Sequence, residues 1–291
     1  MTDTDGAAGA AADDFVLFGG TANPGLAEAV ARELGVALGR SRVVRFPDGE
    51  LSVSLLDSVR RKDVYVVQPT SPPVNDHLME LLAFADVCRR AAAARVTAVV
   101  PYFGYARADR RDRRREPITA SMVAALMQTA GIHHVLSVDL HTPQVEGFFQ
   151  VPVDTLSAVD EIARSLAGTL PADLTVVSPD AGRVRMATDY ARLLGAPLAI
   201  IVKRRESGSE TEVTHLVGDV RGRACLIVDD MISSGGTLVS SIGALREAGA
   251  RVDPITRLSF LRRAGAILGG GAIAAVALPN LSVLAGDGSP P

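Results

Sequence analysis

The chain has 291 residues, of which 47% are hydrophobic and 22% are charged, and its formal net charge is −3. This length suits one large or two medium-sized domains with a packed core. No apolar run reaches the roughly 18 residues of a membrane-spanning helix, the charge offers no general attraction to nucleic acid, and Cys88 and Cys225 lie in apolar stretches that do not suggest a disulfide framework. Residues 1–14 are small and acidic and lack the features of a signal peptide, so we expect a disordered arm on a cytoplasmic protein.

Short apolar strands alternate with amphipathic helices along most of the chain, which is typical of an α/β fold with mainly parallel sheets flanked by helices. In the first half we expect strands at 15–18, 41–45, 51–55, 63–68, 96–102 and 134–140, and helices after Asn23 and at 76–93 and 119–130. In the second half we expect strands at 174–177, 197–202, 213–217 and 225–228, and helices at 159–170, 184–194 and up to Glu247.

Part of this pattern occurs twice. Residues 64–96 and 226–252 each read as a strand, a small-residue loop and a helix that leaves through Arg-Val. We therefore predict two tandem domains of one type, at 15–155 and 156–285, followed by a tail at 286–291.

Residues 46–50 read Phe-Pro-Asp-Gly-Glu between two predicted strands. Pro and Asp-Gly are typical of turns. On composition alone, the segment does no more than close a hairpin.

An arginine cluster follows the predicted strand at 96–102. Six of the nine residues from Arg107 to Arg115 are arginine. Guanidinium groups pair with phosphate oxygens and stack on aromatic planes. A solvated charged face or a nucleic-acid surface would also be rich in arginine, but the cluster is compact and the whole chain is slightly acidic, so we favour a triphosphate site.

Two polar side chains are expected at the carboxyl ends of strands. His141 follows the predicted strand at 134–140, and Asp180 follows the one at 174–177. A lone histidine is more often structural, but an imidazole and a carboxylate at strand ends could share a Mg²⁺ ion, with waters and phosphates as the other ligands.

Lys203 and Arg205 follow the predicted strand at 197–202 and lead into a polar segment at 206–211. Two cations at the start of a mobile loop could stabilise a transferring phosphoryl group and exclude water. The same residues also fit an ordinary solvated turn.

The stretch at 224–237, ACLIVDDMISSGGT, combines a buried strand, two carboxylates and a small-residue turn before a helix. Glycines let backbone N–H groups approach a phosphate, and a helix N-terminus favours its negative charge. Asp229 and Asp230 can accept hydrogen bonds from sugar hydroxyls or hold a metal. We therefore predict a sugar-phosphate pocket here, in preference to a plain strand-to-helix turn.

In their joint order, the motifs of the chain resemble those of the ribose-phosphate diphosphokinase family, whose product is phosphoribosyl diphosphate. They are FPDGE (46–50), NDHLMELL (75–82), PYFGYAR-DRR (101–111), PITA (117–120), VDLH (138–141), GFF-VPVD (147–154), VVSPD-G (176–182), KRR (203–205) and VDDMI--GGT (228–237). The resemblance implies two domains of the type I phosphoribosyltransferase kind, with ATP on the first and ribose 5-phosphate on the second. It also implies a homodimer or homohexamer that has no nucleic-acid or membrane partner.

The resemblance further implies the role of each site residue. The ATP site would comprise Phe46, Asp48, Gly49, Glu50, Arg107, Ala108 and Asp109, with the 46–50 turn reaching adenine from a neighbouring subunit. The ribose 5-phosphate site would comprise Asp229, Asp230, Ser233, Ser234, Gly235, Gly236 and Thr237. His141 and Asp180 would hold Mg²⁺, and the catalytic residues would be Lys203, Arg205 and His141.

Three features depart from the family pattern. Ala108 stands where the family usually has Gln, Ser233 stands where many members have Asp, and the usual motifs are not recognisable after Arg251. These departures leave open a non-catalytic regulatory homologue. A phosphoribosyltransferase is a second alternative, which explains the 224–237 stretch but gives no role to the arginine cluster.

Overall fold

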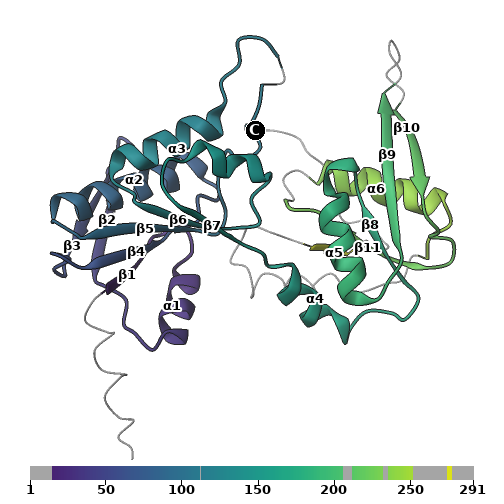
Figure 1. The fold of residues 1–291 in the computed structure, drawn as a ribbon, viewed down its shortest axis with the longest axis horizontal. Coiled ribbons are helices and arrows are strands. Elements are labelled where there is room, and N and C mark those ends of the chain that lie inside the picture. Colours follow the sequence, from purple (N-terminus) through teal and green to yellow (C-terminus); the bar gives the residue numbers. More distant parts are fainter. Residues whose placement is uncertain (1–14, 112, 206–211, 232–234, 252–273, 277–291) are drawn as a thin grey trace, which may run out of the picture. The chain divides into compact units, whose positions relative to one another are not determined.

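The computed structural model describes residues 15–111, 113–205, 212–231, 235–251 and 274–276 (Figure 1). The predicted arm, the predicted loop at 206–211, Ser233 and Ser234, the tail and most of the chain after Arg251 lie outside these residues. The chain divides into two compact units between Ser157 and Ala158, and each unit is described by itself.

The first unit contains a five-stranded parallel sheet in the order β1-β4-β5-β6-β7. Its strands are β1 (Phe15–Gly19), β4 (Asp63–Val67), β5 (Arg95–Val100), β6 (His134–Val138) and β7 (Val153–Leu156). The helices are α1 (Pro24–Glu33), α2 (Val74–Arg90), α3 (Thr119–Ala130) and a 3₁₀ helix, η1 (Pro143–Phe148).

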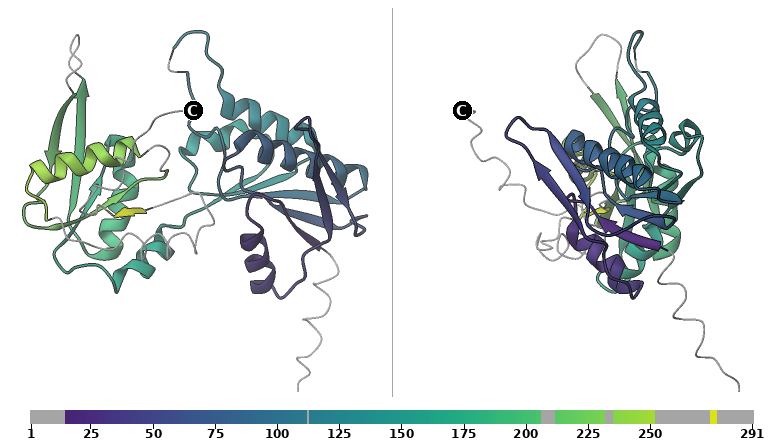
Figure 2. Two further views of the ribbon diagram at one scale, coloured as in Figure 1. Left: turned by 180° about the vertical axis from the view of Figure 1, so that it is seen from behind. Right: turned by 90° about the vertical axis from the view of Figure 1, so that its left-hand side faces the viewer.

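Helices cover both faces of this sheet, with α1 on one side and α2 and α3 on the other (Figures 1 and 2). Neighbouring residues of β1 point to opposite faces, as in any strand. Leu17 packs with Ala27 and Ala31 of α1, whereas Phe18 joins the larger core formed with α2 and α3. Because both faces are buried, the strands read as nearly continuous apolar runs.

A separate hairpin joins β2 (Ser41–Arg45) to β3 (Leu51–Leu55), and it packs against the larger core through Val43, Val53 and Leu55. The turn between them is 46–50. It is closed by a hydrogen bond from the Phe46 N–H to the Glu50 carbonyl oxygen at 2.8 Å, and Gly49 has a φ of 92°.

The second unit contains a mixed sheet in the order β10-β9-β8-β11-β12, in which the inner pairs β9-β8 and β8-β11 are parallel and the outer pairs are antiparallel. Its strands are β8 (Leu174–Ser178), β9 (Leu198–Arg205), β10 (Glu212–Val217), β11 (Ala224–Val228) and β12 (Ala274–Val276). Its helices are α4 (Val159–Ala167), η2 (Ala181–Arg183), α5 (Val184–Leu194) and α6 (Gly236–Glu247).

Helix α6 covers one face of this sheet, and α4 and α5 cover the other (Figures 1 and 2). Ile242 and Leu245 of α6 pack with Ile227 of β11 and Val177 of β8. All five residues of β11 are buried, so the strand is held firmly in the sheet. Asp229 follows its last residue and therefore lies at the carboxyl edge of the sheet.

The predicted α/β fold with mainly parallel sheets is confirmed, and α5 has the predicted bounds. One prediction was wrong. Lys203 and Arg205 do not begin a loop, because their backbone continues β9 and pairs with Thr214 and Glu212 of β10. Among the described helices, none has the length and apolar character needed to cross a lipid bilayer.

Candidate active site

The carboxyl ends of β8 and β11 meet at one edge of the second unit's sheet, because these two strands are parallel neighbours. Beyond β8 lie Asp180 and η2, and beyond β11 lie Asp229 and Asp230. In open α/β sheets this edge is the usual place for a ligand. The first residues of the predicted sugar-phosphate pocket, Asp229 and Asp230, therefore lie at the edge of the sheet where a ligand is expected.

The acidic pair is held by a cation that the sequence reading did not assign. The Arg183 Nε lies 3.1 Å from an Asp230 carboxylate oxygen and 3.7 Å from an Asp229 carboxylate oxygen. All three side chains are largely buried, with exposed fractions of 15% for Arg183, 18% for Asp229 and 5% for Asp230. A guanidinium three residues beyond Asp180 could have been noticed, but only the pairing of β8 with β11 puts it beside the acidic pair.

Burial first and the neighbouring Asp230 second raise the pKa of Asp229 to about 7, even though Arg183 opposes the shift. The Asp230 N–H donates to the Asp229 carboxylate at 2.9 Å, which favours the charged form. Asp229 thus titrates near neutrality, a property common in functional sites.

The start of α6 supplies the other part of the predicted sugar-phosphate pocket. Gly235 caps the helix with a φ of 79°, a left-handed conformation that glycine adopts readily. Gly236 and Thr237 form the first turn and are exposed. N–H groups of a first helical turn have no partner within the helix and can receive an anion. Ser233 and Ser234 lie outside the described residues.

Asp180 fixes the start of η2. Its carboxylate accepts hydrogen bonds from the backbone N–H of Gly182 at 2.7 Å and of Arg183 at 3.1 Å. Asp180 therefore also anchors the backbone of the arginine that reaches the acidic pair.

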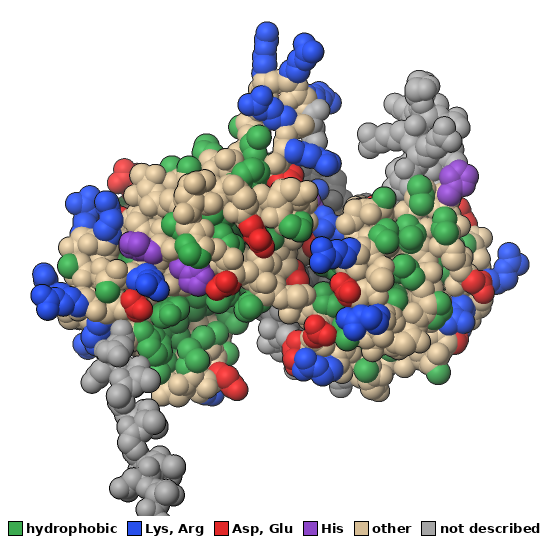
Figure 3. All heavy atoms as spheres, viewed as in Figure 1, with side chains coloured by type: hydrophobic (Ala, Val, Ile, Leu, Met, Phe, Trp, Pro, Cys, Tyr) green, Lys and Arg blue, Asp and Glu red, His purple; other side chains and the backbone are tan. Residues whose placement is uncertain are grey.

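In the first unit, the arginine cluster forms a projecting segment between β5 and α3 (Figures 1 and 3). Arg107, Arg110, Arg111 and the arginines at 113–115 are exposed. The base of the segment is anchored, because the Thr142 hydroxyl donates to the Asp109 carboxylate at 2.6 Å. The contact links Asp109 to Thr142, which directly follows His141 in the sequence.

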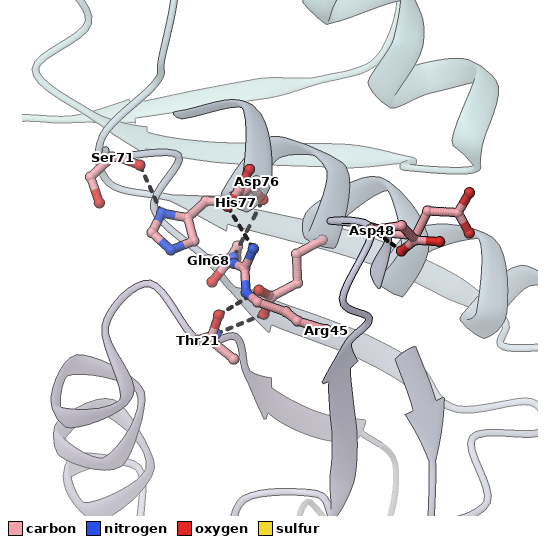
Figure 4. A network of polar contacts seen from close by, with 9 residues as sticks. Thr21, Arg45, Asp48, Gln68, Ser71, Asp76 and His77 are labelled. Carbon is pink, nitrogen blue, oxygen red and sulfur yellow. Dashed lines mark hydrogen bonds and ion pairs between the residues drawn. The ribbon is translucent and has the colours of Figure 1, made fainter. Parts of the chain in front are cut away.

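The 46–50 turn leaves Phe46 exposed, with an exposed fraction of 47%. Figure 4 shows that Arg45, at the end of β2, forms an ion pair with Asp76 of α2 at 2.6 Å. Within the turn, the Glu50 N–H donates to the Asp48 carboxylate at 3.1 Å. The turn is thus tied to the body of the unit at its base, with an aromatic ring open to solvent.

Figure 4 also shows a polar network that the sequence reading missed, at the carboxyl ends of β1 and β4. Glu80, which is fully buried, accepts the Thr21 N–H at 2.7 Å and the Thr21 hydroxyl. Gln68, also fully buried, accepts the Ala22 N–H at 3.2 Å. A Cβ on Gly20 would lie 2.0 Å from the Gln68 side-chain oxygen, so glycine is needed there.

The predicted metal ligands belong to different units, His141 to the first and Asp180 to the second. Across the described part of the chain, no group of three or more His, Cys, Asp or Glu side chains is arranged to hold a metal ion. For Lys203 and Arg205, the structure describes the backbone.

Comparison with known proteins adds two domain matches. Residues 15–131 match the N-terminal domain of ribose phosphate pyrophosphokinase, and residues 154–258 match the phosphoribosyl transferase domain. A ribose-phosphate pyrophosphokinase from Chromobacterium violaceum is 50% identical over 242 residues, which are 83% of this chain and 74% of that protein. One from Brucella melitensis biotype 1 is 46% identical over 269 residues, which are 92% of this chain and 85% of that protein.

Among solved structures, the chain is similar to a phosphoribosylpyrophosphate synthetase from Mycobacterium smegmatis. The TM-score is 0.77 and the sequence identity is 41%. The match covers 89% of this chain and 86% of that one. Both units of the chain therefore have counterparts in one kind of protein.

Proposed function

The chain belongs to the ribose-phosphate pyrophosphokinase family, and on that premise we propose how its residues carry out the family's reaction. The enzyme transfers the diphosphoryl group of ATP to the 1-hydroxyl of ribose 5-phosphate, which gives phosphoribosyl diphosphate and AMP. The 1-hydroxyl oxygen bonds to the β-phosphorus, the bond from that phosphorus to the bridging oxygen of AMP breaks, and the hydroxyl proton is released.

The match of residues 15–131 to the pyrophosphokinase's own N-terminal domain carries this assignment. It favours the diphosphokinase over a phosphoribosyltransferase. Identities near 50% to proteins named as pyrophosphokinases favour a catalytic member over a regulatory homologue.

Ribose 5-phosphate binds the second unit at the carboxyl end of β11. Asp229 and Asp230 accept hydrogen bonds from its hydroxyls, because adjacent carboxylates offer several acceptor sites. The 5-phosphate lies at the start of α6, against the N–H groups that begin with Gly236 and Thr237. Ser233, Ser234 and Gly235 complete this cradle. Support comes from the exposure of Gly236 and Thr237 in the first turn of α6, which Gly235 caps with a left-handed φ.

ATP binds the first unit. Arg107 pairs with its phosphate oxygens, and Ala108 and Asp109 line the same segment, which the Thr142–Asp109 hydrogen bond links to the residue beside His141. Phe46, Asp48, Gly49 and Glu50 contact the adenine of a neighbouring subunit in a homodimer or homohexamer. The exposed ring of Phe46 supports this role, because a solvent-facing aromatic ring can stack on a purine.

Enzymes of the family use a divalent metal ion, which we propose is Mg²⁺ held by His141 and Asp180. Asp180 offers the carboxylate oxygen that Mg²⁺ prefers, and water and phosphate oxygens would fill most of the other positions around the ion. The metal would neutralise charge on the transferring phosphates. Lys203 and Arg205 supply positive charge to the same group as the bond to AMP breaks. A chain that uses ATP and ribose 5-phosphate fits a cytoplasmic location.

A product assay tests this function. The purified chain is incubated with ATP, MgCl₂ and ribose 5-phosphate, and the products are separated by anion-exchange chromatography. We expect AMP and phosphoribosyl diphosphate in equal amounts, and neither when ribose 5-phosphate is left out. Formation of ADP would contradict a diphosphoryl transfer, and no AMP under any of these conditions would favour a non-catalytic homologue.

A further inference from the structure

Arg183 is the residue of the second unit whose placement the family's reaction does not by itself explain. It ends η2 and directly precedes α5. Its guanidinium is directed into the sheet edge, where its exposed fraction is 15%. Burying a guanidinium is costly unless it is paired, and here it is paired with the two carboxylates that follow β11.

The contact has a consequence for the two carboxylates. Asp229 and Asp230 are adjacent in sequence and largely buried, so their negative charges disfavour each other. A guanidinium Nε at 3.1 Å and 3.7 Å attracts both and offsets that repulsion. The planar guanidinium also limits the rotamers that the carboxylates can adopt beside it.

Binding two neighbouring sugar hydroxyls requires that the carboxylates be ionised and that their orientation be fixed. A carboxylate accepts hydrogen bonds from hydroxyls best when it is ionised, and a pair of them must be held at a fixed spacing to accept two bonds at once. We propose that Arg183 is a positioning residue that fixes Asp229 and Asp230 as acceptors for the 2- and 3-hydroxyls of ribose 5-phosphate, and thereby sets the preference for ribose over 2-deoxyribose. This inference rests on the proposed ribose 5-phosphate site.

Two further observations agree with this role. Burial and Asp230 raise the pKa of Asp229, and Arg183 acts in the opposite direction, so it favours the ionised acceptor. The backbone of Arg183 is held separately, because its N–H donates to the Asp180 carboxylate at 3.1 Å. Changing the side chain therefore leaves the start of α5 anchored.

The test compares two substrates in Arg183→Met, with Arg183→Lys as the conservative variant. The matched control is Arg185→Met, an exposed arginine in the first turn of α5, two residues beyond Arg183. For each protein, kcat/KM is measured with ribose 5-phosphate and with 2-deoxyribose 5-phosphate, and KM is measured for ATP. Melting temperatures establish that each variant is folded.

We expect Arg183→Met to lose about 10–100-fold in kcat/KM for ribose 5-phosphate, the size of a lost charge-assisted hydrogen bond. The value for 2-deoxyribose 5-phosphate should change much less, and the KM for ATP should stay within about twofold, because the first unit is untouched. Arg183→Lys should regain part of the preference, and Arg185→Met should match the unchanged chain.

An equal loss for both sugars, with no recovery in Arg183→Lys, would overturn the inference and leave Arg183 a structural role. If Arg183→Met does not fold, Arg183→Lys alone decides, because an unchanged sugar preference in a folded lysine variant would also overturn it. Failure of the unchanged chain to form AMP would overturn the proposed function, and the inference with it, so the two failures are distinguishable.

Discussion

Asp229, which we propose as a ribose 5-phosphate ligand, carries a charge that the fold disfavours. Its carboxylate is mostly buried, lies beside Asp230, and has a pKa of about 7 against an ordinary value of about 4. A protein tolerates such a group when binding needs it, so stability and function oppose each other at this residue.

Asp229→Asn should therefore stabilise the chain while weakening ribose 5-phosphate binding. Because the folded-state pKa is raised, the folded protein holds its proton more tightly than the unfolded chain, and this carboxyl lowers stability as pH rises from about 4 to about 7. Asn retains an oxygen for the Asp230 N–H but carries no charge. Urea denaturation should show a gain of about 1–3 kcal/mol at pH 8 that shrinks toward pH 5. A gain that is the same at both pH values would contradict the charge argument.

Lys203 is a second single residue whose charge we expect to matter for activity. Lys203→Ala should lower kcat by about 10²–10³-fold, because its charge acts mainly as the bond to AMP breaks, and should leave ATP binding nearly unchanged. Steady-state assays of AMP release, with ATP binding measured by calorimetry, check both parts. Arg204→Ala, the next cation on β9, serves as the control and should stay within about threefold. A near-normal rate for Lys203→Ala would remove this residue from the mechanism.

At the scale of the element, two glycine turns carry the proposed ligand contacts. The β2–β3 turn of the first unit is proposed to contact ATP, and the turn before α6 in the second unit is proposed to contact ribose 5-phosphate. Gly49 in the β2–β3 turn has a φ of 92°, and Gly235 before α6 has a φ of 79°. A Cβ at either position would meet nothing within 4 Å. Replacing either glycine with alanine strains the backbone but causes no steric clash. The same substitution therefore perturbs both turns through the same physical effect.

Gly49→Ala and Gly235→Ala form a matched pair. Each should cost about 1 kcal/mol of stability through the left-handed conformation. Gly49→Ala should raise the KM for ATP, and Gly235→Ala should raise the KM for ribose 5-phosphate, by about 3–10-fold each, a shift of roughly 1 kcal/mol. Kinetics with one substrate varied at a time provide the measurement. Equal effects of both variants on both substrates would contradict the assignment of the two subsites.

Sequence patterns predict an element well when its own residues and its immediate neighbours determine where it begins and ends. Helix α5 has the expected bounds because its apolar positions repeat at helical spacing and Gly195 ends it in a left-handed conformation. Strand β7, with four residues, was missed because it is short and follows a proline. The end of β9 was misplaced because its pairing with β10 extends the strand through a polar Lys-Arg-Arg run. Arg183 was missed because its role depends on the adjacency of β8 and β11, which no local pattern contains.

For the whole molecule, metal should matter for activity and little for folding. No described cluster of three or more potential ligands is arranged to hold an ion by itself, and Mg²⁺ sites of this kind depend on substrate phosphates. Removing divalent metal with EDTA should abolish AMP formation and shift the melting temperature by less than about 2 °C, because few protein ligands bind the ion in the absence of substrate. Added MgCl₂ should restore activity. A large drop in melting temperature would indicate a structural metal instead.

The network around Glu80 has a consequence for how many sugar phosphates one chain can hold. The loop after β1 ends a parallel strand and leads into α1, as the loop after β11 leads into α6. In the first of these loops, the chain's own carboxylate and amide already take the amide hydrogens of Thr21 and Ala22. An incoming phosphate would have to displace the buried side chains of Glu80 and Gln68 from these two N–H groups. Titration calorimetry should accordingly find a stoichiometry of one ribose 5-phosphate per chain.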